Sequence, residues 1–170
     1  MTREALASLK WGFVLFFMHI YIGRWDLLPD FLGVYLIWHA FKCQEMTETE
    51  RRMSPLLIVL MVDTFLHWIL NFDNQLENLI ISVISTYTIY ILIGEIANRI
   101  EAVQPDRAEN LELLRAFFAG LQVFNYLFGA YDNFVIVMLT AICLLVVLAN
   151  LLWVLFKIQP TDGVDEINLQ

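Results

Sequence analysis

The residues best suited to chemistry are an aspartate and a histidine in an otherwise apolar stretch. Asp63 and His67 are four positions apart, so they share one face of a helix. A charged side chain in the middle of a bilayer costs roughly 2.5–3.5 kcal/mol on insertion scales, and such residues often mark functional sites. The pair could exchange a proton, or the carboxylate could hold a histidine tautomer for a ligand. The alternative is polar glue, a hydrogen bond that only fixes helix packing.

Three segments share a pattern in which a polar residue precedes an aromatic–Asp pair. They are His19 before Trp25-Asp26, His67 before Phe72-Asp73 and Asn125 before Tyr131-Asp132. Internal repeats are common in membrane transport folds and often frame a binding site. Convergent turn chemistry is the other interpretation, because aromatic residues gather at membrane interfaces and Asp is a preferred N-cap.

Together with polar positions on neighbouring segments, these residues define an outward-facing polar site for a small solute. Its predicted members are His19, Asp63, His67, Thr86, Tyr90 and Asn125. We predict no catalytic residues, no metal ligands and no cofactor, because the chain lacks the HExxH, GxSxG, P-loop and GxGxxG patterns. Two histidines could in principle ligate a b-type haem, but no supporting spacing accompanies them. An enzyme is therefore the least favoured class.

The composition shows what solvent must surround these residues. Hydrophobic residues make up 59% of the 170-residue chain and charged residues only 16%, against about a quarter charged in soluble domains. A folded domain of this size still exposes about 30% of the surface of its unfolded chain. In water, so apolar a chain could not bury enough of its hydrophobic side chains. The expected partners are the lipid bilayer, a small-molecule ligand and a membrane partner subunit. The net charge of −8 argues against a nucleic-acid partner.

Apolar stretches predict an all-α fold, a bundle of six transmembrane helices built from three helical hairpins. The expected helices cover about residues 5–22, 27–41, 54–72, 76–97, 111–128 and 134–156. Ser54-Pro55 is a helix start signal, a Ser N-cap followed by Pro in the first turn. Residues 1–157 would form one transmembrane domain, and residues 158–170 a cytoplasmic tail.

The basic residues predict the orientation of this bundle. All of the 10 Lys and Arg residues except Arg24 fall on one side of the expected helices. The side rich in Lys and Arg is cytoplasmic. Both termini are therefore expected in the cytoplasm, with the three tight turns facing outward.

The segment DLLPDFLG, Asp26–Gly33, resembles a segment of an uncharacterised family of small multi-pass membrane proteins of Firmicutes bacteria. The resemblance implies a bacterial inner-membrane protein and no particular activity. Asp26 can cap the second helix, Pro29 fits its first turn, and Gly33 permits close packing. The expected architecture is also similar to the substrate-binding subunits of energy-coupling-factor vitamin transporters. Those subunits dock a partner through an Ala-x-x-x-Ala surface, whose nearest equivalent here is Ser8-x-x-x-Gly12.

The sequence therefore favours a bacterial integral membrane protein that binds or transports a small solute through an outward-facing polar site. The competing class is a non-catalytic accessory or assembly subunit of a membrane complex. In that case the polar residues would serve only to pack helices together.

Overall fold

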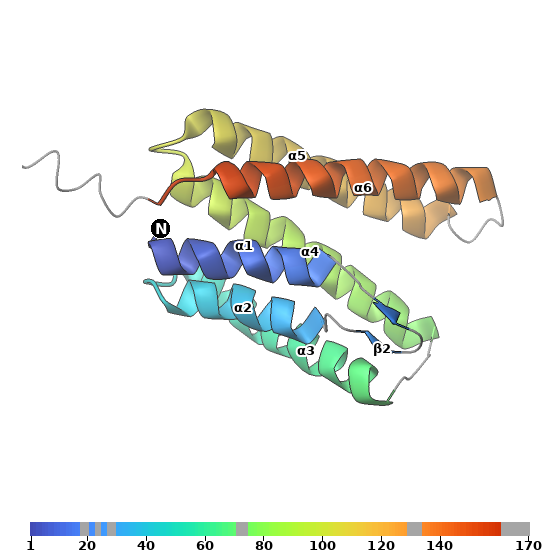
Figure 1. Ribbon diagram of the computed structural model, residues 1–170. Helices are drawn as coiled ribbons and strands as arrows, with labels where there is room; N and C mark the ends of the chain where they lie inside the picture. Colours follow the sequence, from blue (N-terminus) through green and yellow to red (C-terminus); the bar gives the residue numbers. More distant parts are fainter. Residues whose placement is uncertain (18–20, 23–24, 27–29, 71–74, 129–133, 161–170) are drawn as a thin grey trace, which may run out of the picture. The chain divides into compact units, whose positions relative to one another are not determined.

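The computed structural model describes residues 1–17, 21–22, 25–26, 30–70, 75–128 and 134–160 (Figure 1). These contain six helices: α1 (Arg3–Phe17), α2 (Asp30–Lys42), α3 (Glu48–Leu70), α4 (Gln75–Ile100), α5 (Pro105–Phe128) and α6 (Phe134–Lys157). Two-residue strands β1 (Tyr21–Ile22) and β2 (Trp25–Asp26) pair antiparallel, with Tyr21 opposite Asp26. Apart from this short ladder, the regular secondary structure of the described residues is helical, which confirms the all-α prediction.

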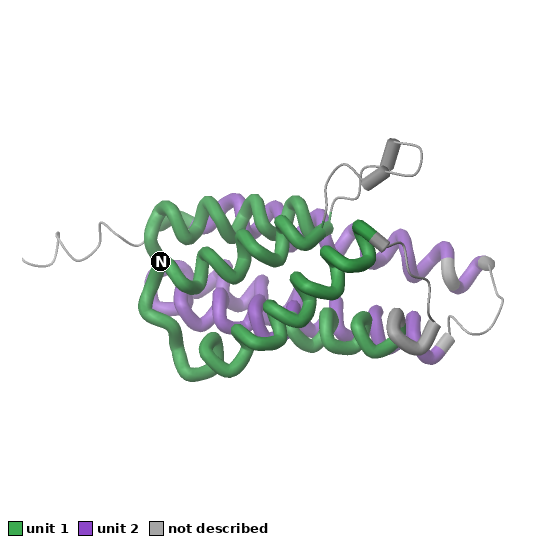
Figure 2. Tube along the Cα trace, turned by 90° about the horizontal axis from the view of Figure 1, so that it is seen from below, with its two compact units in different colours: residues 1–88, 159–170 green, residues 89–158 purple. Residues whose placement is uncertain are grey.

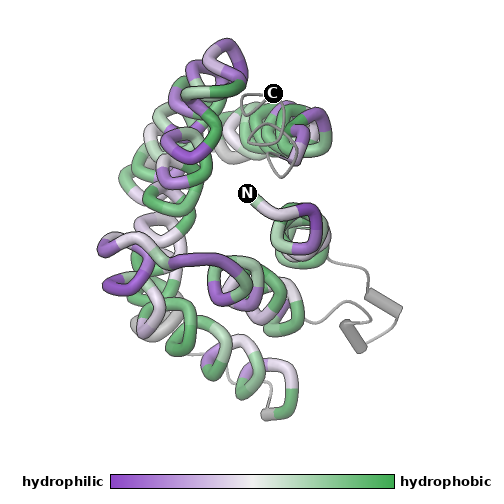
Figure 3. Tube along the Cα trace, turned by 90° about the vertical axis from the view of Figure 1, so that its left-hand side faces the viewer, coloured by the Kyte–Doolittle hydropathy of each residue, from purple (hydrophilic) through white to green (hydrophobic). Residues whose placement is uncertain are grey.

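Among the described residues, three helices are long and apolar enough to cross a membrane. The candidate spans are Glu48–Ile69, Leu79–Ile100 and Met138–Lys157, and apolar residues predominate along the helices (Figure 3). The first two helices are shorter. With 15 and 13 residues, α1 and α2 reach about 22 and 20 Å at ~1.5 Å per residue, less than the ~30 Å hydrocarbon core of a bilayer.

The chain divides into two compact units, coloured separately in Figure 2. The first unit comprises Met1–Thr88 with Gln159–Gln170, and the second comprises Ile89–Ile158. The first unit thus contains α1, α2, α3 and the first half of α4. The second contains the rest of α4 with α5 and α6.

The packing of α1 against α2 depends on two facing glycines. A Cβ atom on Gly33 would lie 2.6 Å from the backbone nitrogen of Phe16 and 2.8 Å from the carbonyl oxygen of Gly12. A Cβ atom on Gly12 would lie 2.9 Å from the carbonyl oxygen of Gly33 and 2.7 Å from a side-chain carbon of Ile37. The expectation that Gly33 permits close packing is confirmed. Gly12, the predicted partner-docking position, is covered by α2.

The start of α3 lies earlier in the chain than the predicted start at Ser54. A capping box sets it, because the Thr47 backbone N–H donates to Glu50 Oε2 at 2.8 Å and the Glu50 N–H donates to Thr47 Oγ1 at 3.2 Å. Ser54 instead accepts a hydrogen bond from Trp38 Nε1 at 3.0 Å, and Pro55 lies inside the helix. The charged residues before Ser54 are helical because charge alone does not end a helix.

Two further boundaries also differ from the sequence-based ranges. Helix α5 begins at Pro105 rather than at residue 111, and the Gln104 carbonyl oxygen accepts from the N–H groups of Arg107 and Ala108. Proline suits a first helical turn because its missing N–H would have no partner there. Helix α1 ends at Phe17 rather than at residue 22. Strand β1 occupies the end of the predicted helix, where Tyr and Ile are residue types enriched in strands.

Candidate functional site

The predicted Asp–His pair is present on α3. His67 Nδ1 lies 3.6 Å from Asp63 Oδ2, and the two side chains are 30% and 13% exposed, respectively. The i,i+4 spacing places both groups on one face of the helix. The sequence-based expectation that these two residues adjoin is confirmed.

The backbone contact of His67 favours the tautomer with a proton on Nδ1. Nδ1 lies 3.3 Å from the carbonyl oxygen of Asp63, which can only accept a hydrogen bond. Nδ1 must therefore be the donor. In a neutral imidazole the other nitrogen, Nε2, then presents a lone pair.

Nε2 of His67 is the chemically available atom of this pair. It is buried and has no hydrogen-bond partner among the described residues. A buried polar atom left in this state costs about 1–3 kcal/mol. Such an atom in a native structure calls for an explanation, of which a bound polar group is one.

The pair lies nearer one end of α3 than the sequence indicated. Because the helix runs from Glu48 to Leu70, Asp63 lies in its second half and His67 in its last turn. The capping box at residue 47 shifts the middle of the helix toward its N-terminus. The pair therefore lies nearer the C-terminal end of its helix than a helix starting at residue 54 would place it.

The other predicted site residues are distributed differently. His19 lies outside the described residues, as do most residues of the three repeated turns. Thr86 belongs to the first unit with the Asp–His pair, whereas Tyr90 and Asn125 belong to the second. Asp63 and His67 are in contact with each other on α3.

Tyr90 contributes to a cluster that the sequence did not predict. The guanidinium of Arg115 lies over the Tyr90 ring, 4.7 Å from its centroid, and Arg115 also pairs with Glu112. Gly94 makes room for it, since a Cβ atom there would collide with the Arg115 side chain. Because α5 begins at Pro105 rather than at residue 111, Arg115 lies about three turns into that helix rather than in the first turns. Tyr90 therefore packs against a cation on α5.

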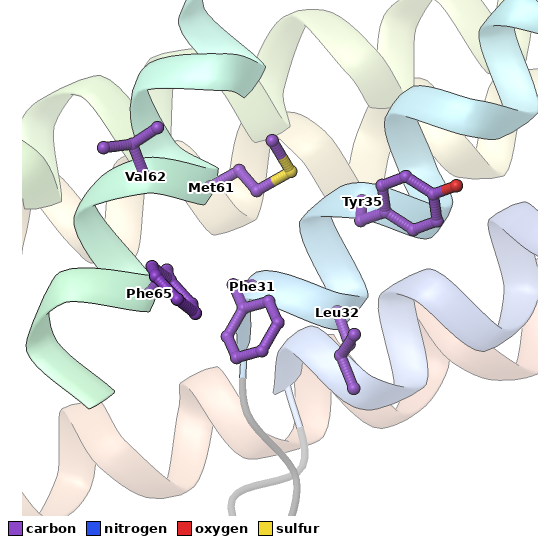
Figure 4. Close-up of a pocket in the computed structure, with 6 residues that line it drawn as sticks. All are labelled: Phe31, Leu32, Tyr35, Met61, Val62 and Phe65. Atoms are coloured by element: carbon purple, nitrogen blue, oxygen red, sulfur yellow. The ribbon is translucent and has the colours of Figure 1, made fainter. Parts of the chain in front are cut away.

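A second feature missed by the sequence is an apolar groove between α2 and α3. Its cavity volume is about 390 Å³, and its lining consists of Phe31, Leu32, Tyr35, Met61, Val62 and Phe65 (Figure 4). The Phe31 ring sits edge-on to the rings of Phe65 and Trp68, with centroids 5.2 and 5.7 Å apart. The volume falls within the range of ligand pockets, roughly 300–1,000 Å³. Only the pairing of the two helices creates this groove, so hydrophobic periodicity alone could not reveal it.

Comparisons with known proteins leave the site to be interpreted from its geometry. No protein-family model matches the chain, and no curated protein or solved structure is significantly similar to it. Within the described residues, no group of three or more His, Cys, Asp or Glu side chains is arranged to hold a metal ion.

Proposed function

We propose that this protein is an integral membrane protein that binds or transports a small solute at the Asp63–His67 pair. One observation carries the proposal. His67 Nε2 is buried without a hydrogen-bond partner among the described residues, beside a carboxylate, on a helix apolar enough to cross a membrane. Ionisable residues inside membrane segments commonly mark substrate or ion pathways.

The geometry suggests what kind of solute the pair would accept. Neutral His67 offers a lone pair at Nε2, so it accepts a hydrogen bond or a proton. When it takes a proton, the Asp63 carboxylate on the Nδ1 side offsets the positive charge. The favoured solute therefore carries a hydroxyl, amide or ammonium donor.

The alternative is an accessory or assembly subunit in which the pair only packs helices. That role calls for a hydrogen bond from His67 to another helix. Both contacts of its Nδ1 atom are instead made to Asp63 on α3. These contacts of His67 therefore connect no second helix, which is the observation that favours solute binding at this residue.

The finer topology is part of the same proposal. All six helices would enter the membrane of a bacterial cell, with both termini and the Lys- and Arg-rich loops in the cytoplasm. The distribution of basic residues supports this orientation. His19, Thr86, Tyr90 and Asn125 would then join the pair around an outward-facing site.

Mass spectrometry of the purified protein tests the solute proposal. Wild-type protein extracted in a mild detergent should retain a small molecule, which Asp63→Asn and His67→Gln should both lose. Thr64→Val is the matched control on the same helix, because the Thr64 hydroxyl donates to the Leu60 carbonyl oxygen at 2.7 Å. Thr64→Val should keep the molecule. A wild-type preparation without one, or two variants that retain it fully, would contradict the proposal.

A further inference from the structure

The apolar groove between α2 and α3 is open to the surroundings of the protein. Three of its lining side chains, Leu32, Tyr35 and Val62, are 42%, 42% and 48% exposed. In Figure 4 the aromatic rings of Phe31 and Phe65 adjoin at one end of the groove, and Tyr35 lies at the other end. Because α3 is apolar enough to cross a membrane, the molecules that reach this opening are lipids.

Each wall of the groove continues along its helix to a cation. On α2 the stripe runs through Phe31, Tyr35 and Trp38 to Lys42, whose ammonium lies 4.1 Å from the Trp38 ring centroid. These positions are spaced by three or four residues and therefore share one helix face.

The corresponding stripe on α3 ends at an arginine. It runs from Phe65 through Val62 and Ile58 to Arg51, with spacings of three, four and seven residues. Arg51 is exposed in the first turn of α3. Because only residues 43–47 separate α2 from α3, Lys42 and Arg51 lie at the same end of the groove.

The charges around this end leave a positive balance. The exposed charged residues from 42 to 53 are three cations, Lys42, Arg51 and Arg52, and two acids, Glu45 and Glu48, of which Glu48 pairs with Arg52. Glu50 keeps its charge in the capping box but is buried, at 2% exposed. The exposed side chains at this end therefore carry an excess of one positive charge.

The distance along the helices from the groove to the two cations matches one leaflet of a bilayer. At ~1.5 Å per residue, Val62 lies about 17 Å along α3 from Arg51, and Phe31 lies about 17 Å along α2 from Lys42. Half of a hydrocarbon core is about 15 Å thick. A lipid with its phosphate at the cationic end would therefore place the end of an acyl chain in the cavity.

We infer that this groove binds an anionic phospholipid of the surrounding leaflet. One acyl chain lies against Phe31, Val62 and Phe65, and the phosphate lies between Lys42 and Arg51. Basic pockets between membrane helices on the cytoplasmic side are known to hold anionic headgroups. The site is separate from the proposed solute site, because Asp63 and His67 occupy the opposite face of α3.

Native mass spectrometry with defined lipids tests this inference. Detergent-purified wild-type protein is titrated with phosphatidylglycerol or phosphatidylcholine of identical acyl chains. Wild type should retain phosphatidylglycerol in preference, and each cation should contribute about a fivefold preference. The double variant Lys42→Gln/Arg51→Gln should lose the preference. Lys157→Gln is the control, because Lys157 lies over Trp153 as Lys42 lies over Trp38, but on α6.

A second pair of variants tests the apolar part of the groove. Val62→Trp places a large ring in the cavity and should reduce retention of both lipids, whereas Val59→Trp, at an exposed position on the same helix outside the lining, should not. Equal retention of the two lipids by wild type overturns the inference, as does a preference that survives loss of both cations. Equal lipid retention by the Val62→Trp and Val59→Trp variants also overturns the inference. His67→Gln should leave lipid retention unchanged. Failure of the solute proposal can therefore be distinguished from failure of the lipid inference.

Discussion

Replacing Gly33 with alanine should force α1 and α2 apart. The new methyl group would meet the backbone nitrogen of Phe16 at 2.6 Å and the carbonyl oxygen of Gly12 at 2.8 Å. Both obstacles are backbone atoms, which cannot rotate away as the end of a flexible side chain can. Ordinary van der Waals contact begins near 3.4 Å, so the two helix backbones would have to separate by a substantial part of an ångström.

The expected cost follows from this separation. Overpacking of a tight core costs typically 1–3 kcal/mol, and the upper end applies because rigid backbone blocks the methyl group. Contacts along the interface also weaken, since a gap of ~0.5–1 Å forfeits a quarter to a half of each dispersion contact. Fully buried Leu9 and Phe13 belong to this interface region of α1. Alanine recovers about 1 kcal/mol of helix propensity, so the net loss should be about 2 kcal/mol.

Unfolding of the purified protein in detergent measures this loss. Gly120→Ala is the matched control, because nothing lies within 4 Å of a Cβ atom at that helical position. The control should be unchanged or more stable by up to about 1 kcal/mol, through helix propensity alone. Gly12→Ala combined with Gly33→Ala should cost less than the sum of the two, since both disrupt one contact. A Gly33→Ala protein as stable as wild type would refute the reasoning.

Three other changes should have defined outcomes. Glu50→Ala removes half of the capping box and should lower the free energy of unfolding by about 1 kcal/mol, measured by the same assay. Gly94→Ala displaces the Arg115 guanidinium from the Tyr90 ring. The variant should be about 1 kcal/mol less stable than the Gly120→Ala control, because a partly buried cation–π contact contributes about that much. In a variant lacking the native cysteines, a single cysteine at Asn133 should react with an impermeant reagent on intact cells. One at Thr49 should not, and its labelling would overturn the proposed orientation.

The helical content and the Asp–His pair were predictable because both depend on local spacing. Asp63 and His67 adjoin in any helix that contains them, whatever packs around it. Gly33 was predictable for a similar reason, since a helical glycine beside apolar neighbours allows another backbone to approach. These inferences required no knowledge of which helices pair.

The helix starts were harder because the sequence contains two competing signals. Thr47-x-x-Glu50 and Ser54-Pro55 are both start signals, and the charged residues between them resemble a linker. The capping box determines the start because its two reciprocal hydrogen bonds satisfy backbone N–H groups that have no partner within the first turn of the helix. Ser54 is then free to accept the indole N–H of Trp38, a contact that connects α3 to α2.

Tyr90 and the groove depend on tertiary contacts that periodicity does not contain. The polar stripe on α4 placed Tyr90 in the solute site, but the long side chain of Arg115 reaches its ring from α5. Likewise, the stripes on α2 and α3 look like ordinary apolar faces until the two helices adjoin. The sequence shows which residues are apolar, whereas pairing decides which of them leave a cavity.

The two proposed sites use α3 in complementary ways. With 3.6 residues per turn, the groove residues Val62 and Phe65 lie nearly opposite Asp63 and His67. The exposed fractions follow the same order, because Val62 and Phe65 are 48% and 41% exposed whereas the side chains of His67 and Asp63 are 30% and 13% exposed. Polar groups in membrane helices face the protein interior or a cavity rather than lipid. If both proposals hold, α3 separates the lipid in the groove from the polar pair on its opposite face, so lipid and solute would bind without contacting each other.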